Sequence, residues 1–136
     1  MRTRRRSWWS CSICVLVAFG ATACAGSQDE SALTAAQAYA AALADGDGDV
    51  ACAVLAPSVR SELEQTTGKA CERAILDEGV VTEGHGLEVL VFGTSAQVRL
   101  DDDTVFLSRF QDGWHVTAAA CSPTPRGVYD CRIKAS

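Results

Sequence analysis

The first 23 residues are typical of a segment that is removed before the mature protein folds. They therefore determine which residues form the folded domain and in which compartment it folds. Arginines stand at positions 2, 4, 5 and 6, and an apolar segment of 16 residues runs from Trp8 to Ala23. A basic start, a short apolar stretch and small residues at its end are the three parts of a secretory signal peptide. A membrane-spanning helix needs roughly 20 apolar residues, more than this segment has. We therefore expect residues 1–23 to be a signal peptide and the mature chain to lie outside the cytoplasm.

Cys24 follows the small residues directly. Ala21-Thr22-Ala23-Cys24 resembles the lipobox of bacterial lipoproteins, although Leu is usual where Ala21 stands. The resemblance implies that the Cys24 thiol receives a diacylglyceryl group, that the chain is cut before it, and that the new N-terminus is acylated, for example with palmitate. Two or three acyl chains give stable attachment, since a single chain binds only marginally. This predicts an anchor on the extracytoplasmic face of the cell membrane; the alternative is an ordinary signal peptide cut near Ala23, with Cys24 incidental.

Composition narrows the possible partners of the mature chain. Its 113 residues make one domain of ordinary size, large enough for a core. It keeps eight of the 12 basic residues and all 17 acidic ones, so its net charge is −9 rather than the −5 of the whole chain. Such a domain repels phosphate backbones, which argues against nucleic-acid binding. Attachment to anionic lipid then depends on the acyl chains on Cys24.

The cysteines of the mature chain predict disulfides. Two of the seven lie in the leader and Cys24 is the anchor, which leaves Cys52, Cys71, Cys121 and Cys131. An even number in an exported chain indicates disulfide pairing, and three pairings are possible. We favour Cys52–Cys71 and Cys121–Cys131, because each joins neighbouring elements. Each bond would stabilise the fold by about 3 kcal/mol in the chain-entropy model. Paired cysteines would serve neither as nucleophiles nor as zinc ligands.

The first part of the mature chain predicts helices. Residues 24–31 would hold the lipidated cysteine and a polar tether, with Ser31 as a helix cap. The next residues place a set on one helical face before the helix ends near Asp45-Gly46: Leu33, Ala36, Ala40 and Leu43. A short helix over 50–56 should follow. Pro57 suits the first turn of another helix that runs to about residue 66, and Gly68 would break it before a last turn at Cys71.

Residues 45–49, Asp-Gly-Asp-Gly-Asp, invite comparison with a calcium loop. Carboxylates at alternate positions resemble the start of an EF-hand loop. That loop also needs Gly at its sixth position and a bidentate Glu at its twelfth, where this chain has Val50 and Ala56. The pattern is therefore incomplete, and we interpret it as a turn in which Asp47 or Asp49 caps the next helix.

From Gly79 the sequence period changes to that of strands. Residues alternate in character over 87–92, 96–100 and 114–118, with a further strand over 104–110. Gly93-Thr94 and residues 111–113 predict tight connections. Residues 121–125 are expected to leave the sheet, and 128–133 to return as a short strand. Helices followed by an antiparallel meander predict an α+β domain over residues 32–136.

The order of these segments resembles the nuclear transport factor 2-like, SnoaL-like superfamily. The shared features are Ala-Asp-Gly-Asp at 44–47, Leu-Ala-Pro at 55–57 and Asp-Gly-Trp-His-Val at 112–116. The cysteine placement, with a final Tyr-Asp-Cys at 129–131, is similar to that of small lipoproteins of high-GC bacteria. The resemblance covers about residues 32–133. It implies a cone, in which N-terminal helices pack on a curved antiparallel sheet of about four to six strands. Members include isomerases, dehydratases, cyclases and non-catalytic binding modules, so the fold does not decide the activity.

Four residues are candidates for a pocket or contact surface: Tyr39, Asp49, Arg99 and His115. Enzymes of the superfamily use Asp, His or Tyr side chains that point into the cone. Strand alternation places a polar row opposite the apolar rows: Gln97, Arg99, His115 and Thr117. We therefore expect His115 at the surface rather than as a base, His85 exposed in a glycine-flanked loop, and Tyr39 in the core. No catalytic residue, metal ligand or cofactor is assigned.

The expected function is that of a lipid-anchored, extracytoplasmic, non-catalytic module that binds a protein or a small ligand. One alternative is a small enzyme of the isomerase or hydrolase type that uses a pocket in the cone. Another is an accessory subunit of a membrane complex, with the polar row as its contact. A deep pocket that contains His115 or Asp49 would favour the enzyme, and a filled cone with His115 outside would favour the module.

Overall fold

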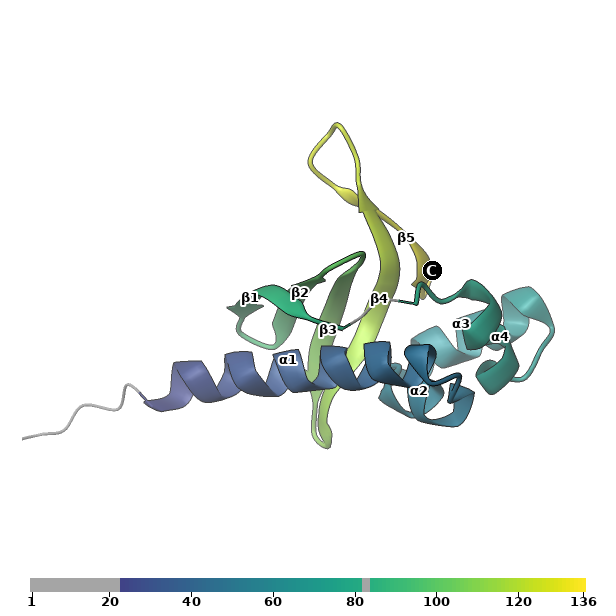
Figure 1. Ribbon diagram of the computed structural model, residues 1–136, viewed down its shortest axis with the longest axis horizontal. Helices are drawn as coiled ribbons and strands as arrows, with labels where there is room; N and C mark the ends of the chain where they lie inside the picture. Colours follow the sequence, from purple (N-terminus) through teal and green to yellow (C-terminus); the bar gives the residue numbers. More distant parts are fainter. Residues whose placement is uncertain (1–22, 82–83) are drawn as a thin grey trace, which may run out of the picture.

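A computed structural model describes residues 23–81 and 84–136, so the predicted signal peptide lies outside the described residues apart from Ala23. The order of elements is helices first and strands second (Figure 1). The helices are α1 (Ala23–Ala44), α2 (Gly48–Val54), α3 (Pro57–Thr67) and α4 (Cys71–Glu78). The strands are β1 (Gly86–Phe92), β2 (Ser95–Leu100), β3 (Thr104–Phe110), β4 (Gly113–Pro123) and β5 (Tyr129–Lys134). This confirms the α+β class.

Helix α1 packs on the sheet through an alanine-rich face. Its buried residues recur at helical spacing: Ala32, Ala36, Tyr39, Ala40 and Leu43. The helix begins earlier than expected, because the polar tether is itself helical. Ser31 does not cap the helix; its hydroxyl donates to the Ser27 carbonyl at 2.6 Å, inside the helix. With no proline to stop it, α1 extends beyond the sheet as a polar stalk, defined here as residues 24–31 (Figure 1).

The three short helices form a cluster held by a disulfide. Pro57 stands at the start of α3, and Gly68 ends it in the left-handed conformation with φ 65°. The Cys52–Cys71 disulfide joins α2 to α4, as expected. Gly48 lets these two helices approach closely, since a Cβ atom there would lie 2.0 Å from the Glu72 carbonyl oxygen. This cluster contacts β4 and β5 of the sheet, and at one of these contacts the Ala56 amide donates to the Val116 carbonyl at 2.8 Å.

The sheet is an antiparallel meander in which the strands follow one another in the order β1 to β5. Its inner face packs on α1 and the short helices. Residues at alternate positions on this face are buried: Ala96, Val98, Leu100, Val105, Leu107, Trp114 and Val116. The expected alternation on β2 and the first half of β4 is therefore confirmed.

Strand β4 differs from expectation in its second half. It does not leave the sheet at Cys121 but continues to Pro123 and pairs with β5, where the Cys121–Cys131 disulfide joins the two strands. The pairing with β3 shifts register twice, and Ala120 has φ 54°. These β-bulges alter the alternation, so Ala119 is buried in place of Ala118. The strand could not be predicted to its end because a bulge breaks the period on which the prediction depended.

Candidate functional site

The face of the sheet opposite α1 carries side chains that remain partly or wholly exposed. Strand register aligns them in two rows, Leu90–Gln97–Phe106 and Phe92–Ser95–Ser108–His115. We call these two rows, together with Phe110, the open face. Phe92 is 69% exposed, Phe110 44% and Leu90 39%. Large apolar side chains grouped on an uncovered sheet face are typical of a surface that contacts another molecule.

The structure places the four candidate residues at four separate positions. Arg99 and His115 lie on the same side of the sheet, as alternation predicted, but two strands and two rows apart. Arg99 forms an ion pair with Glu88 at 3.4 Å, both side chains being about half exposed. Tyr39 is in the core, as expected, and Asp49 is on the exposed surface of α2. These residues therefore do not form one site.

His115 is less exposed than predicted. Its side chain is only 16% exposed, because the Phe110 ring packs edge-on against it at a centroid distance of 5.3 Å. Its Nε2 lies 3.1 Å from a carboxylate oxygen of Asp112, whereas its Nδ1 is buried without a hydrogen-bond partner. Ser108 lies opposite it across the strands but makes no hydrogen bond to that nitrogen. The three residues thus lack the serine–imidazole bond that activates a nucleophile. His85 is exposed, as expected, with its side chain 73% accessible.

The Asp-Gly-Asp-Gly-Asp segment folds as a helix–helix turn. Gly46 takes the left-handed conformation after α1, with φ 70°. Asp47 caps α2, since its carboxylate accepts a hydrogen bond from the Val50 amide at 3.0 Å. This confirms the interpretation of the segment as a turn. Among residues 23–81 and 84–136, no group of three or more His, Cys, Asp or Glu side chains is placed to hold a metal ion.

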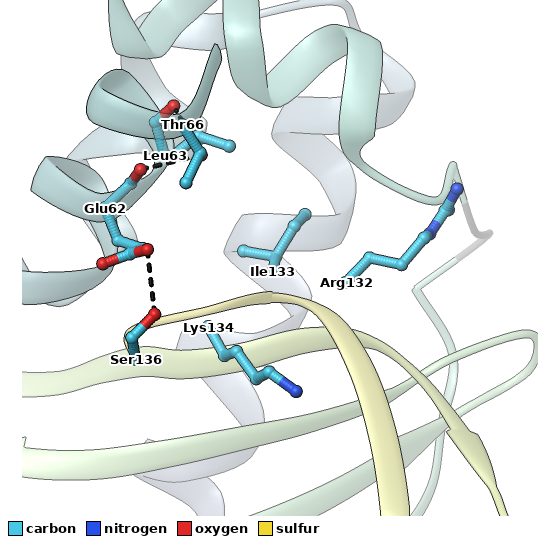
Figure 2. Close-up of a pocket in the computed structure, with 7 residues that line it drawn as sticks. All are labelled: Glu62, Leu63, Thr66, Arg132, Ile133, Lys134 and Ser136. Carbon is cyan, nitrogen blue, oxygen red and sulfur yellow. Dashed lines mark hydrogen bonds between the residues drawn. The ribbon is translucent and has the colours of Figure 1, made fainter.

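A small hollow lies between α3 and β5, with a volume of about 160 Å³. Figure 2 shows the side chains that line it: Glu62, Leu63, Thr66, Arg132, Ile133, Lys134 and Ser136. Glu62 accepts a hydrogen bond from the Ser136 hydroxyl at 2.9 Å, whereas the charged ends of Arg132 and Lys134 point away from Glu62 and from each other (Figure 2). The two cations therefore do not converge on a ligand.

A wider and more open hollow of about 360 Å³ lies where the β2–β3 turn meets the β4–β5 hairpin. Asp101, Asp102 and Asp103 line it. Asp103 stabilises the fold, because its two carboxylate oxygens accept hydrogen bonds from the amides of Ala120 and Cys121 at 2.9 and 2.8 Å. Burial raises the pKa of Asp103, although these backbone hydrogen bonds oppose the shift. Asp103 thus holds the bulge in β4.

Tyr39 adds a buried polar group to the same region of the core. It is 1% exposed, and its hydroxyl has no hydrogen-bond partner. Burial raises the pKa of Tyr39, and the Asp103 carboxylate raises it further, while Arg132 opposes them. The hydroxyl therefore stays protonated at neutral pH. Neither of the two hollows described above is lined by Tyr39, which is consistent with a packing role.

Sequence reasoning missed the apolar part of the open face. It identified the polar row but did not assign Leu90, Phe92, Phe106 or Phe110 to the same surface. The sequence of β1 did indicate this surface, because it has apolar residues at both even and odd positions. A strand with one face in water usually alternates between apolar and polar residues.

The chain has no match among protein-family models, curated proteins or solved structures. In the part of the chain that the structure describes, no helix combines the length and the apolar character needed to cross a bilayer.

Proposed function

We propose that this protein is a lipid-anchored, extracytoplasmic module that binds a protein partner through the open face of its sheet, without catalysis. The observation that carries the proposal is the open face itself. It exposes Phe92 and Phe110 beside polar groups on a sheet in which the Cys121–Cys131 disulfide joins β4 to β5. Exposed aromatic side chains on a rigid frame are the usual anchors of protein interfaces.

The polar groups around this face support binding over catalysis. Glu88 pairs with Arg99, and Asp112 pairs with His115, so these four side chains are already engaged with one another. A catalytic acid or base needs to reach a substrate proton directly. Paired charges beside exposed aromatic rings suit the rim of a protein contact better, since rim charges set specificity and association rate.

The N-terminal stalk would connect the proposed anchor to the domain. Cys24 lies within α1, so acyl chains on this residue would join the domain through a helix rather than through a flexible linker. Two disulfides are also expected of a domain outside the cytoplasm. We further propose that helices and meander together make a cone of the nuclear transport factor 2-like kind, on the basis of the matching order of elements.

The test places a photo-crosslinking amino acid at Gln97 of the open face, in intact cells. The control carries it at Arg73, which is exposed on α4. We expect one defined protein adduct from position 97 and none from position 73. A second arm replaces the whole polar row: Gln97, Arg99, His115 and Thr117. That variant should lose the partner on co-purification; equal recovery with the wild type would refute the proposed contact, including its form as an accessory subunit of a membrane complex.

One observation favours the alternative of a small enzyme. His115 is largely buried, carries a carboxylate partner and leaves Nδ1 free. A substrate bound beside it would shield it from diethyl pyrocarbonate, whereas His85 at 73% exposure would still react. Selective protection of His115 by a small molecule would favour the enzyme over the binding module.

A further inference from the structure

The start of α1 and the end of β1 lie on the same side of the molecule. The chain entering β1 runs along α1 toward its N-terminus: a Cβ atom at Gly84 would lie 3.3 Å from the Ala40 Cβ, and one at Gly86 would contact the Leu33 side chain. Strand β1 continues in that direction to Phe92. Figure 1 shows β1 as the strand nearest the start of α1. The tight turn after Phe92 is therefore the part of the sheet closest to Cys24.

The stalk sets how far this turn can be from a membrane. Ala32 is the first fully buried residue of α1, eight positions after Cys24. At 1.5 Å per residue, an α-helix covers about 12 Å over that length. Because the spacer is helical, acyl chains on Cys24 would hold the sheet within this short distance of the bilayer surface. The β1 end of the sheet would then face the headgroups.

The side chains at this end have the chemistry of the membrane interface. Phe92 and Leu90 are 69% and 39% exposed. Arg109 is exposed and stands beside the turn, since its amide donates to the Thr94 carbonyl at 2.8 Å. Strand alternation directs its side chain to the side of Leu107 and Trp114, so it borders the β1 edge from the face opposite Leu90 and Phe92. Among the described residues it has no carboxylate partner. We call Leu90, Phe92 and Arg109 the β1 tip. Protein segments that bind at a membrane interface insert apolar side chains at the boundary between headgroups and acyl chains, and place cationic side chains near the lipid phosphates.

We propose that the β1 tip rests in the headgroup layer of the phospholipid bilayer and orients the domain on it. The inference depends on the proposed acyl anchor. The acyl chains would attach the domain to the membrane, and the β1 tip would fix the orientation of the domain on it. The sheet would then meet the membrane with its β1 edge. Leu90 and Phe92 would contact lipid, and the protein partner of the open face would contact Phe110 and His115, which lie further along it. A second copy of the chain is the less favoured occupant, because each mature chain carries a net charge of −9 and the copies repel each other.

The experiment uses the full mature lipoprotein in phosphatidylcholine vesicles, with and without brominated acyl chains, which quench nearby tryptophan. The wild type carries one mature tryptophan, Trp114, which is buried in the core. Phe92→Trp reports on the β1 tip. Val128→Trp is the control, since Val128 is 60% exposed at the β4–β5 hairpin, which Figure 1 shows far from the start of α1. We expect Trp at 92 to shift its emission to shorter wavelength and lose most of its intensity to brominated lipid, and Trp at 128 to do neither.

Intact mass separates failure of this inference from failure of the anchor. A chain without acyl mass refutes the anchor and the inference together. An acylated chain that floats with the vesicles while Trp at 92 keeps solvent-like emission refutes the orienting contact alone. A shift to shorter wavelength without bromine quenching, growing with protein density in the vesicle, also refutes it and assigns the β1 tip to a second copy.

Discussion

Replacing Gly48 by alanine should destabilise the domain by bringing a methyl group into the α2–α4 contact. The new Cβ would lie 2.0 Å from the Glu72 carbonyl oxygen and 2.7 Å from its carbonyl carbon. Carbon atoms in contact normally stay about 3.5 Å apart, and the obstructing atoms belong to the backbone, so the two helices must separate. The Cys52–Cys71 disulfide resists that separation.

The expected loss is about 2 kcal/mol in the free energy of unfolding. Overpacking of this kind costs about 1–3 kcal/mol. Alanine would regain at most about 1 kcal/mol of helix propensity, and less at the first position of a helix. The backbone at Gly48 is not in the left-handed region, so conformational strain adds nothing to this figure.

The assay is urea unfolding of the Cys24→Ser form without reductant, followed by the fluorescence of Trp114, which is 8% exposed. Gly26→Ala is the matched control, because nothing lies within 4 Å of a Cβ atom at that position. We expect the control to change stability by less than about 1 kcal/mol, toward greater stability. If Gly48→Ala were as stable as Gly26→Ala, the close approach of α2 and α4 would be wrong.

Three further predictions concern single polar side chains. Tyr39→Phe should stabilise the domain by about 1 kcal/mol in thermal or urea unfolding, because it removes a buried hydroxyl without a partner; a loss of stability would show that the hydroxyl is bonded. Asp103→Asn should cost about 1–3 kcal/mol, since one amide of the β4 bulge loses its acceptor. Burial raises the pKa of Asp103 in the folded protein above the ordinary value of 3.8. The contribution of this carboxyl to the free energy of unfolding is therefore fully present below pH 3.8 and is lost as pH rises through the raised folded pKa. The difference in stability between the wild type and Asp103→Asn should accordingly narrow as pH rises. A gap that widens would contradict this sign. Asp47→Ala should lower the free energy of unfolding by about 1 kcal/mol, because α2 loses its cap. Calcium should leave the melting temperature of the wild type unchanged; a rise on adding calcium would show that residues 45–49 bind the metal.

Local chemistry explains which parts of the fold could be predicted from the sequence. Helix α3 begins at Pro57, because proline suits a first helical turn, and it ends at Gly68, because glycine can adopt φ 65°. The two disulfides followed from sequence neighbours, since short loops bring cysteines together whatever the wider fold. Strand alternation placed Arg99 and His115 on one face because the side-chain period of two is intrinsic to a strand.

What could not be predicted depends on contacts between distant residues. The Asp103 carboxylate accepts hydrogen bonds from the amides of Ala120 and Cys121, which lie 17 and 18 positions further on, and so holds the bulge in β4. The exposure of His115 depends on the Phe110 ring across a hairpin. Alternation gives the direction of a side chain but not the neighbours that cover it.

We claim that acyl groups on Cys24, at the start of a helical stalk, attach the protein to the membrane, and intact mass with membrane fractionation can test this. The wild type is compared with Cys24→Ser in the same cells. The claim predicts a chain that begins at Cys24, carries the mass of its acyl groups and sediments with membranes, and a Cys24→Ser protein that is released. A wild-type protein secreted without acyl mass would contradict it.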